Sequence, residues 1–159
     1  MILQTKGLID MKKEIKPYYH KVQYYETDGM RIVHHSNYIR WMEETRTDYL
    51  VQAGFPYDVL ESRGILFPVL SVSCDYKTAV PFGGTVKIQM QLDWFDGLRY
   101  GVSYIMTDAD DESIVHLTGT TTHCFLNKDL RPMRIKKEAP DVYQAFCEYA
   151  NELRGMAAK

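Results

Sequence analysis

One stretch decides the fold of this chain, and it reads NYIRWMEETRTDYLVQAG from Asn37 to Gly54. Side chains that suit a buried face recur in it at helical spacing, namely Tyr38, Trp41, Met42, Thr45, Tyr49 and Ala53. Ser36 or Asn37 is a natural N-cap, and Gly54 stands where a left-handed residue ends a helix. The spacing predicts one long helix with one buried stripe.

The chain on both sides of this helix is rich in strand patterns. Before it, Tyr18, His20, Val22 and Tyr24 alternate with other residues, which predicts a strand from Pro17 onward. After it, the patterns predict a short helix over 56–63, strands over 67–76, 86–92, 99–107 and 113–125, and a final helix over 140–153.

These elements predict an α+β fold. The later strands follow one another through short connections, such as the tight-turn signal Asp96-Gly97, so they pair antiparallel. A lone long helix must bury its stripe, and the sheet is the only large partner, so we expect a curved antiparallel sheet of about five strands against it. The 159 residues fit one domain, which we place at 17–159 after a loose N-terminal tail over 1–16.

Composition excludes several classes of partner. With 19 basic and 21 acidic side chains the formal charge is −2, so no positive field attracts nucleic acid or an anionic membrane. The longest apolar run, 65–70, is too short to span a membrane, and the first residues lack the apolar centre of a signal peptide. The 3 cysteines form no CxxC pair and argue against a disulfide framework. We expect a cytoplasmic protein with no nucleic-acid binding and no membrane insertion.

Asp28 lies in a segment without strand or helix periodicity, just before the long helix. A helix N-terminus presents unpaired backbone N–H groups that can polarise a carbonyl or stabilise an oxyanion. A carboxylate in the preceding loop can act there as nucleophile or general base. This arrangement suits acyl transfer. A second interpretation also fits, in which Asp28 caps a turn and the nearby histidines pack or face solvent.

The stretch from Tyr24 to Leu50 resembles the hot-dog-fold acyl-CoA thioesterases of the 4-hydroxybenzoyl-CoA thioesterase type. The matching residues are Tyr25-Glu26-Thr27-Asp28, Ile32-Val33, His35, Asn37-Tyr38, Glu43 and Arg46. A weaker likeness continues through 76–81 and 84–86, and 126–135 resembles the closing strand and tail of that family. The resemblance implies a hot-dog fold, in which the sheet wraps around the long central helix.

The resemblance also implies roles for single residues. Asp28 would attack the thioester carbonyl or activate a water to do so, releasing free CoA and a carboxylic acid. His35 matches the position whose backbone N–H faces the thioester oxygen, and its side chain would orient the acyl group or assist the departing thiolate. The positions implied to bind substrate are Arg31, Val33, His34, Asn37, Tyr38 and Glu43. No metal or redox cofactor is implied.

One position departs from the family pattern. Relatives usually carry Gly three residues after the Asp, where this chain has Arg31. Because Gly permits backbone conformations that Arg resists, we expect Gly29 to absorb the bend of this loop instead. The Arg31 side chain is then free to meet the phosphates of CoA.

Other residues offer alternative sites. A second hot-dog lineage places its catalytic Glu on the central helix, where this chain has Glu43 and Glu44, and the competing interpretation is ion pairing with Arg40 or Arg46. The histidines show no HxxxH or HExxH spacing, so we expect no metal site.

The resemblance implies a homodimer or homotetramer, because the substrate tunnel of the family lies between subunits. A single sheet with unpaired edges also favours pairing between copies. Two other functions stay open: a hot-dog hydratase or dehydratase, and a non-catalytic acyl-CoA-binding protein. The acyl chain and the carrier, either CoA or acyl-carrier protein, are not decided by the sequence.

Overall fold

The long helix predicted from the spacing is α1 (Asn37–Gln52), in a computed structural model that describes the backbone of residues 14–157 and the side chains of residues 14–150. The predicted stripe is buried at Tyr38, Trp41, Met42, Thr45 and Tyr49, whereas Ala53 lies beyond the last turn and is exposed. Ser36 is the N-cap residue, but its hydroxyl contacts Nδ1 of His34 at 2.8 Å. Gly54 has a φ of 85°, which confirms the left-handed residue that ends the helix.

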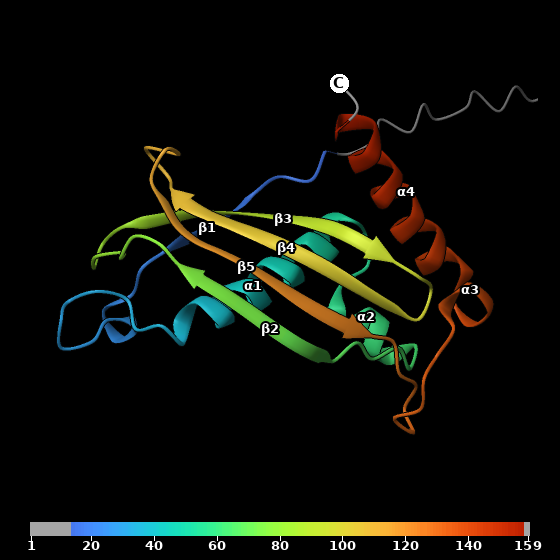
Figure 1. The fold of residues 1–159 in the computed structure, drawn as a ribbon. Coiled ribbons are helices and arrows are strands. Elements are labelled where there is room, and N and C mark those ends of the chain that lie inside the picture. Colours follow the sequence, from blue (N-terminus) through green and yellow to red (C-terminus); the bar gives the residue numbers. More distant parts are fainter. Residues whose placement is uncertain (1–13, 158–159) are drawn as a thin grey trace, which may run out of the picture.

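A five-stranded antiparallel sheet forms the second layer, and α1 lies against one of its faces (Figure 1). The strands are β1 (Tyr18–Lys21), β2 (Val69–Tyr76), β3 (Thr85–Phe95), β4 (Arg99–Asp108) and β5 (Val115–Cys124). Their order in the sheet is β1-β3-β4-β5-β2. This arrangement confirms the α+β class and the curved sheet around a central helix that the sequence predicts.

The alternation of buried and exposed side chains predicted over 86–92 is confirmed in β3. Val86 and Ile88 are fully buried beneath α1, while Gln89 and Gln91 are exposed. The Asp96-Gly97 signal is confirmed as well, because Asp96 Oδ1 accepts the backbone N–H groups of Leu98 and Arg99 in the turn from β3 to β4.

The first strand is shorter than predicted. β1 ends at Lys21, and Tyr24 belongs to a single 3₁₀ turn, η1 (Tyr24–Glu26), instead of the strand. The cause is the Glu26 carboxylate, which accepts the backbone N–H of Gln23 at 2.8 Å. A local side chain–backbone bond therefore overrides the alternating pattern and turns the chain toward Asp28.

The C-terminal part departs from the resemblance in one place. After the short helix α2 (Tyr57–Ser62) and the sheet, the expected closing strand is absent from 126–135, where Leu126 forms only single pairs with Leu66 and Pro132. Ile135 instead begins α3 (Ile135–Glu138). The final helix is confirmed as α4 (Pro140–Ala157), which packs against β3 (Figure 1).

The expected tail over 1–16 falls largely on residues 1–13, which lie outside the described residues. Lys16, at its end, exchanges two hydrogen bonds with the Gln52 side chain, at 2.8 and 3.0 Å. In the described part of the chain no helix is long and apolar enough to cross a membrane.

Candidate active site

Asp28 sits on a tight hairpin loop between η1 and α1. Thr27 pairs with Val33 across the loop, the Asp28 N–H donates to the Ile32 carbonyl at 2.9 Å, and the Arg31 N–H donates to the Asp28 carbonyl at 2.9 Å. This is the bonding of a β-turn followed by one extra residue, a bulge that normally requires a left-handed conformation. The carboxylate is thus carried on a closed, hydrogen-bonded loop.

Arg31 is the residue that adopts the left-handed conformation, with a φ of 62°. The expectation that Gly29 absorbs the bend is wrong, because Gly29 has no positive φ. The reason is positional: the bulge residue is the one after the turn, and hydrogen bonding of Asp28 with Arg31 and Ile32 fixes that residue as Arg31. The Arg31 side chain is exposed and forms no ion pair with the described residues.

The Asp28 side chain is half-buried. Its Oδ1 accepts the backbone N–H of Met30 at 2.8 Å, which fixes the carboxylate against its own turn. Its Oδ2 has no hydrogen-bond partner among residues 14–150, whose side chains the structure describes. The turn-capping interpretation is therefore correct for one carboxylate oxygen, and the other oxygen is available for chemistry.

His35 lies at the entrance to α1 with its side chain exposed. Its carbonyl accepts the Tyr76 hydroxyl at 2.9 Å, and this bond ties the helix start to β2. Within the described chain the His35 backbone N–H has no hydrogen-bond partner. An unpaired N–H at the start of a helix is the kind of donor that can polarise a carbonyl.

Glu26 anchors the loop to α1 and β1, and reasoning from the sequence assigned it no role beyond its place in the motif. Its side chain is 5% exposed, and it accepts hydrogen bonds from Trp41 and His20 at 2.8 and 2.9 Å as well as from the Gln23 N–H. Burial opposes ionisation of this carboxyl, but the Gln23, His20 and Trp41 bonds outweigh it and hold its pKa below the usual value. The signal that could have identified it is an acidic residue placed before a run of buried aromatic positions.

The Glu26 backbone binds the second arm of the loop. Its carbonyl accepts the His34 N–H and the Asn37 Nδ2, both at 2.8 Å. Val33, Asn37 and Tyr38 are buried, and the Val33 N–H donates to the Val80 carbonyl at 2.9 Å. These three residues, which the resemblance implied to bind substrate, are therefore buried beneath the loop and hold it in place.

His34 and His35 contact each other, but neither side chain is bonded to the Asp28 carboxylate. The ring centroids of His34 and His35 lie 4.1 Å apart with the rings tilted by 35°, and neither ring forms a hydrogen bond with Asp28. Both histidine side chains are exposed.

The glutamates of α1 differ in their contacts. Glu44 contacts β1, since its Oε2 accepts the Tyr18 hydroxyl at 2.8 Å and lies 3.0 Å from His20 Nδ1. The predicted alternative of ion pairs with Arg40 or Arg46 is wrong for Glu44. The Glu43 side chain is exposed, and its carboxylate forms no hydrogen bond and no ion pair with residues 14–150.

This geometry is accompanied by a family match. A model of the thioesterase-like superfamily matches residues 22–147, a span that contains the Asp28 loop, α1 and the whole sheet from β2 onward. The chain belongs to this superfamily. It is a hydrolase of the thioesterase class, as the resemblance implied.

Relatives and solved structures agree with this assignment. The chain is 32% identical over 136 residues to the "Putative acyl-CoA thioesterase YneP" of Bacillus subtilis, covering 85% of this chain and 94% of that protein. It is 34% identical to a "Putative esterase" of Aquifex aeolicus, over 79% of this chain and 94% of that protein. The structure superimposes on the DHNA-CoA thioesterase of Staphylococcus aureus with a TM-score of 0.82 at 27% identity, covering 89% of this chain and 94% of that one.

Two further features of this thioesterase bear on the site. No group of three or more His, Cys, Asp or Glu side chains that could hold a metal ion occurs in the described part of the chain. A cavity of about 100 Å³ lies along the second half of α1, between Arg46 and Ala53, and is not lined by the Asp28 loop.

Proposed function

We propose that this thioesterase hydrolyses acyl-CoA thioesters at the Asp28 loop. The observation that carries the proposal is the free Oδ2 of a half-buried Asp28, held on a closed loop that leads directly to the unpaired His35 N–H. A carboxylate and a carbonyl-polarising donor are the two groups that thioester cleavage needs. The names of the relatives support acyl-CoA as the substrate class.

In the proposed reaction the carbonyl oxygen of the thioester accepts a hydrogen bond from the His35 N–H. Asp28 either attacks the carbonyl carbon, forming an acyl–Asp28 anhydride that a water then hydrolyses, or removes a proton from a water that attacks this carbon; in both cases the carbon–sulfur bond breaks. The sulfur leaves as CoA thiolate and takes up a proton, and water supplies the oxygen of the carboxylic acid. The likeness to the 4-hydroxybenzoyl-CoA type supports an Asp in this role, and the exposed Arg31 and His34 are available to contact the CoA moiety and acyl group.

The proposed site is shared between subunits of a homodimer or homotetramer. β2 is an edge strand, paired on one side only, and it presents exposed apolar side chains at Val69, Leu70 and Val72. An exposed apolar edge strand favours pairing with a second copy. Tyr76, at the end of β2, bonds the His35 carbonyl, so pairing at this edge brings a partner subunit toward the Asp28 loop.

A cytoplasmic location is part of the same proposal. It is supported by Cys74, Cys124 and Cys147, which are all free thiols, as expected in a reducing compartment.

The test is a thiol-release assay on a panel of aromatic, short-chain and long-chain acyl-CoA substrates. The wild-type protein should release CoA from at least one class, and Asp28→Asn should not. Asp110→Asn, in the exposed turn after β4, is the matched control and should behave as wild type. Hydration of an enoyl-CoA without thiol release would instead support the hydratase alternative, and binding without turnover would support the acyl-CoA-binding alternative.

A further inference from the structure

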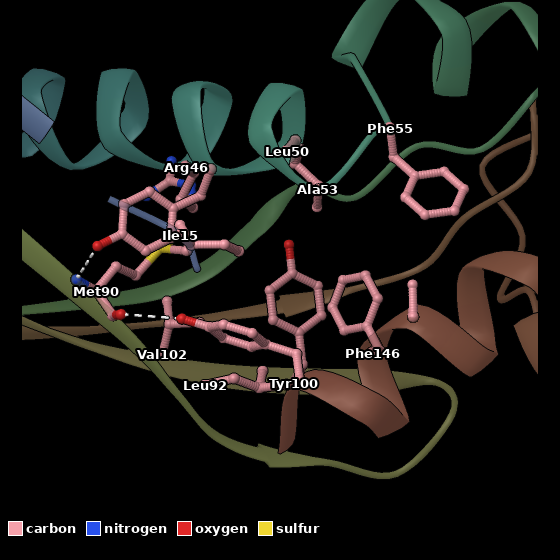
Figure 2. Close-up of a pocket in the computed structure, with 13 residues that line it drawn as sticks. Ile15, Arg46, Leu50, Ala53, Phe55, Met90, Leu92, Tyr100, Val102 and Phe146 are labelled. Atoms are coloured by element: carbon pink, nitrogen blue, oxygen red, sulfur yellow. Dashed lines mark hydrogen bonds between the residues drawn. The ribbon is translucent and has the colours of Figure 1, made fainter. Parts of the chain in front are cut away.

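The cavity along α1 is bounded by four elements that meet at one end of the sheet, and by Ile15, which precedes β1. Its apolar walls are Leu50 and Phe55 around the end of α1, Leu92 on β3, Val102 on β4, and Ala145 and Phe146 on α4 (Figure 2). Its volume of about 100 Å³ is somewhat below the ~150 Å³ of an engineered cavity that holds benzene. The space therefore suits a small apolar group.

Three tyrosines line this cavity, and two of them use their hydroxyls on the backbone of one residue. The Met90 N–H donates to Tyr49 Oη at 3.1 Å, and Tyr149 Oη donates to the Met90 carbonyl at 3.2 Å (Figure 2). Met90 lies beyond the end of the β1–β3 pairing, which stops at Ile88. These two hydroxyls therefore satisfy the backbone N–H and carbonyl of Met90 at a part of the β3 edge that β1 does not pair.

The hydroxyl of the third tyrosine, Tyr100, has no such structural role. Its side chain is only 5% exposed, and its ring is fixed by stacking on His123 at 4.7 Å with an interplanar angle of 11°. Its hydroxyl points into the cavity toward α1 (Figure 2) and has no hydrogen-bond partner among the described residues. The side chain as a whole is buried, but its hydroxyl faces the cavity space and is therefore a free donor that a ligand in the cavity can use.

The second polar group at the cavity is Arg46. Its Nη1 donates to Tyr104 Oη at 3.0 Å, and it forms no ion pair with a carboxylate among residues 14–150, whose side chains the structure describes. Burial raises the pKa of Tyr100 well above its usual value, with the nearby charge of Arg46 acting in the opposite direction. The cavity thus offers an O–H donor and a positive charge, and no anionic group.

We propose that this cavity binds a short-chain carboxylic acid. The alkyl group would fill the apolar space, and the carboxylate would accept the Tyr100 O–H close to the charge of Arg46. A neutral ligand would leave the Arg46 charge without a counter-ion, and a cation would be repelled. The site is separate from the Asp28 loop, so it is a second ligand site and does not depend on the proposed reaction.

The experiment is a calorimetric titration of the whole protein with butanoate, pentanoate and hexanoate, with the matching alcohols as neutral probes. At least one acid should bind, and its alcohol should bind more weakly. Tyr100→Phe removes only the donor and should weaken binding by roughly tenfold to a hundredfold, the usual effect of one hydrogen bond to a charged group. Ala145→Phe fills the cavity and should abolish binding at this site, with thioesterase activity retained.

Two controls separate this site from the Asp28 loop. Tyr19→Phe removes an exposed phenol hydroxyl elsewhere and should leave acid binding unchanged. Asp28→Asn should also retain acid binding even where hydrolysis is lost. If no acid binds in the millimolar range, or if binding is insensitive to both Tyr100→Phe and Ala145→Phe, the proposal is wrong. Equal affinity for acids and alcohols would overturn the carboxylate assignment, and thermal unfolding of each variant verifies that it folds.

Discussion

The indole N–H of Trp41 donates to Oε1 of Glu26 at 2.8 Å, and this bond joins the buried face of α1 to the turn that precedes Asp28. Trp41 is fully buried and Glu26 nearly so. The other carboxylate oxygen binds the Gln23 N–H and His20. One buried carboxylate thereby holds β1, the 3₁₀ turn and the helix in a fixed relation, and the loop that carries Asp28 follows directly from this turn.

Replacing this carboxylate should therefore reduce both stability and activity. In Glu26→Gln an amide NH₂ takes the place of one acceptor oxygen, so a buried donor loses its partner at a cost of about 1–3 kcal/mol in unfolding free energy. Urea unfolding and thiol release measure the two effects. Glu44→Gln, at the exposed end of the same contact to His20, is the control and should cost less than about 1 kcal/mol. Equal losses in both variants would contradict the anchoring role of Glu26.

The left-handed conformation of Arg31 predicts a substitution that stabilises the protein, whereas Glu26→Gln destabilises it. A non-glycine residue at a φ of 62° is strained by roughly 1–2 kcal/mol, and Gly removes that strain while adding freedom to the unfolded chain. Arg31→Gly should therefore raise the unfolding free energy, by about 1 kcal/mol at most. Leu130→Gly, at a φ of 58° outside the loop, is the matched control and should shift stability similarly. If Arg31→Gly destabilises the protein while Leu130→Gly does not, the Arg31 side chain contributes a stabilising contact.

These residues also show what the sequence could and could not predict. The long helix and β3 were predictable because their signal is local, an apolar spacing that repeats over many residues. The early end of β1 was not, because it depends on one side chain, Glu26, capturing the Gln23 N–H. The position of the bend at Arg31 required the hydrogen bonds between the two arms of the loop.

The candidate site likewise has some features that the sequence predicts and others that depend on tertiary packing. Asp28 and His35 were identified from the resemblance, and the structure adds a free oxygen and an unpaired N–H at those positions. The unpartnered hydroxyl of Tyr100 could not be predicted, because it results from tertiary packing of β4 against α1 and α4 and leaves no pattern in the sequence.

The buried His123 predicts how stability depends on pH. Burial, together with the charge of Arg46, lowers its pKa from 6.5 to about 4. Between these values the unfolded chain binds a proton that the folded protein does not, so stability is complete above pH 6.5 and is lost as the pH falls toward 4. At 1.36 kcal/mol per unit the loss is up to about 3 kcal/mol. His123→Gln, which cannot titrate, should show a smaller decrease in unfolding free energy over this range, and an unchanged decrease would contradict the assignment.

The exposed edge of β2 predicts the assembly. Val72 is 40% exposed at the middle of this unpaired strand edge, so Val72→Lys should place a charge in the proposed interface between copies. Light scattering should show an oligomer for the wild type and a smaller species for the variant, with loss of activity if the site is shared. Ile114→Lys, 38% exposed in the turn before β5, is the matched control and should keep the wild-type mass. A wild-type monomer with full activity would refute the shared site.

The roles of Asp28 and Glu43 are separated by a pair of isosteric substitutions. Asp28→Asn keeps the shape of the side chain and its acceptor for the Met30 N–H but removes the charge and basicity of the free oxygen. If Asp28 is the nucleophile or general base, thiol release should fall by roughly two to four orders of magnitude, while unfolding free energy changes by about 1 kcal/mol or less. Glu43→Gln removes an exposed carboxylate that forms no hydrogen bond in the described chain and should leave kcat within a few fold. The reverse pattern, with turnover lost in Glu43→Gln and retained in Asp28→Asn, would place the catalytic carboxylate on the helix and leave Asp28 as a turn-forming residue only.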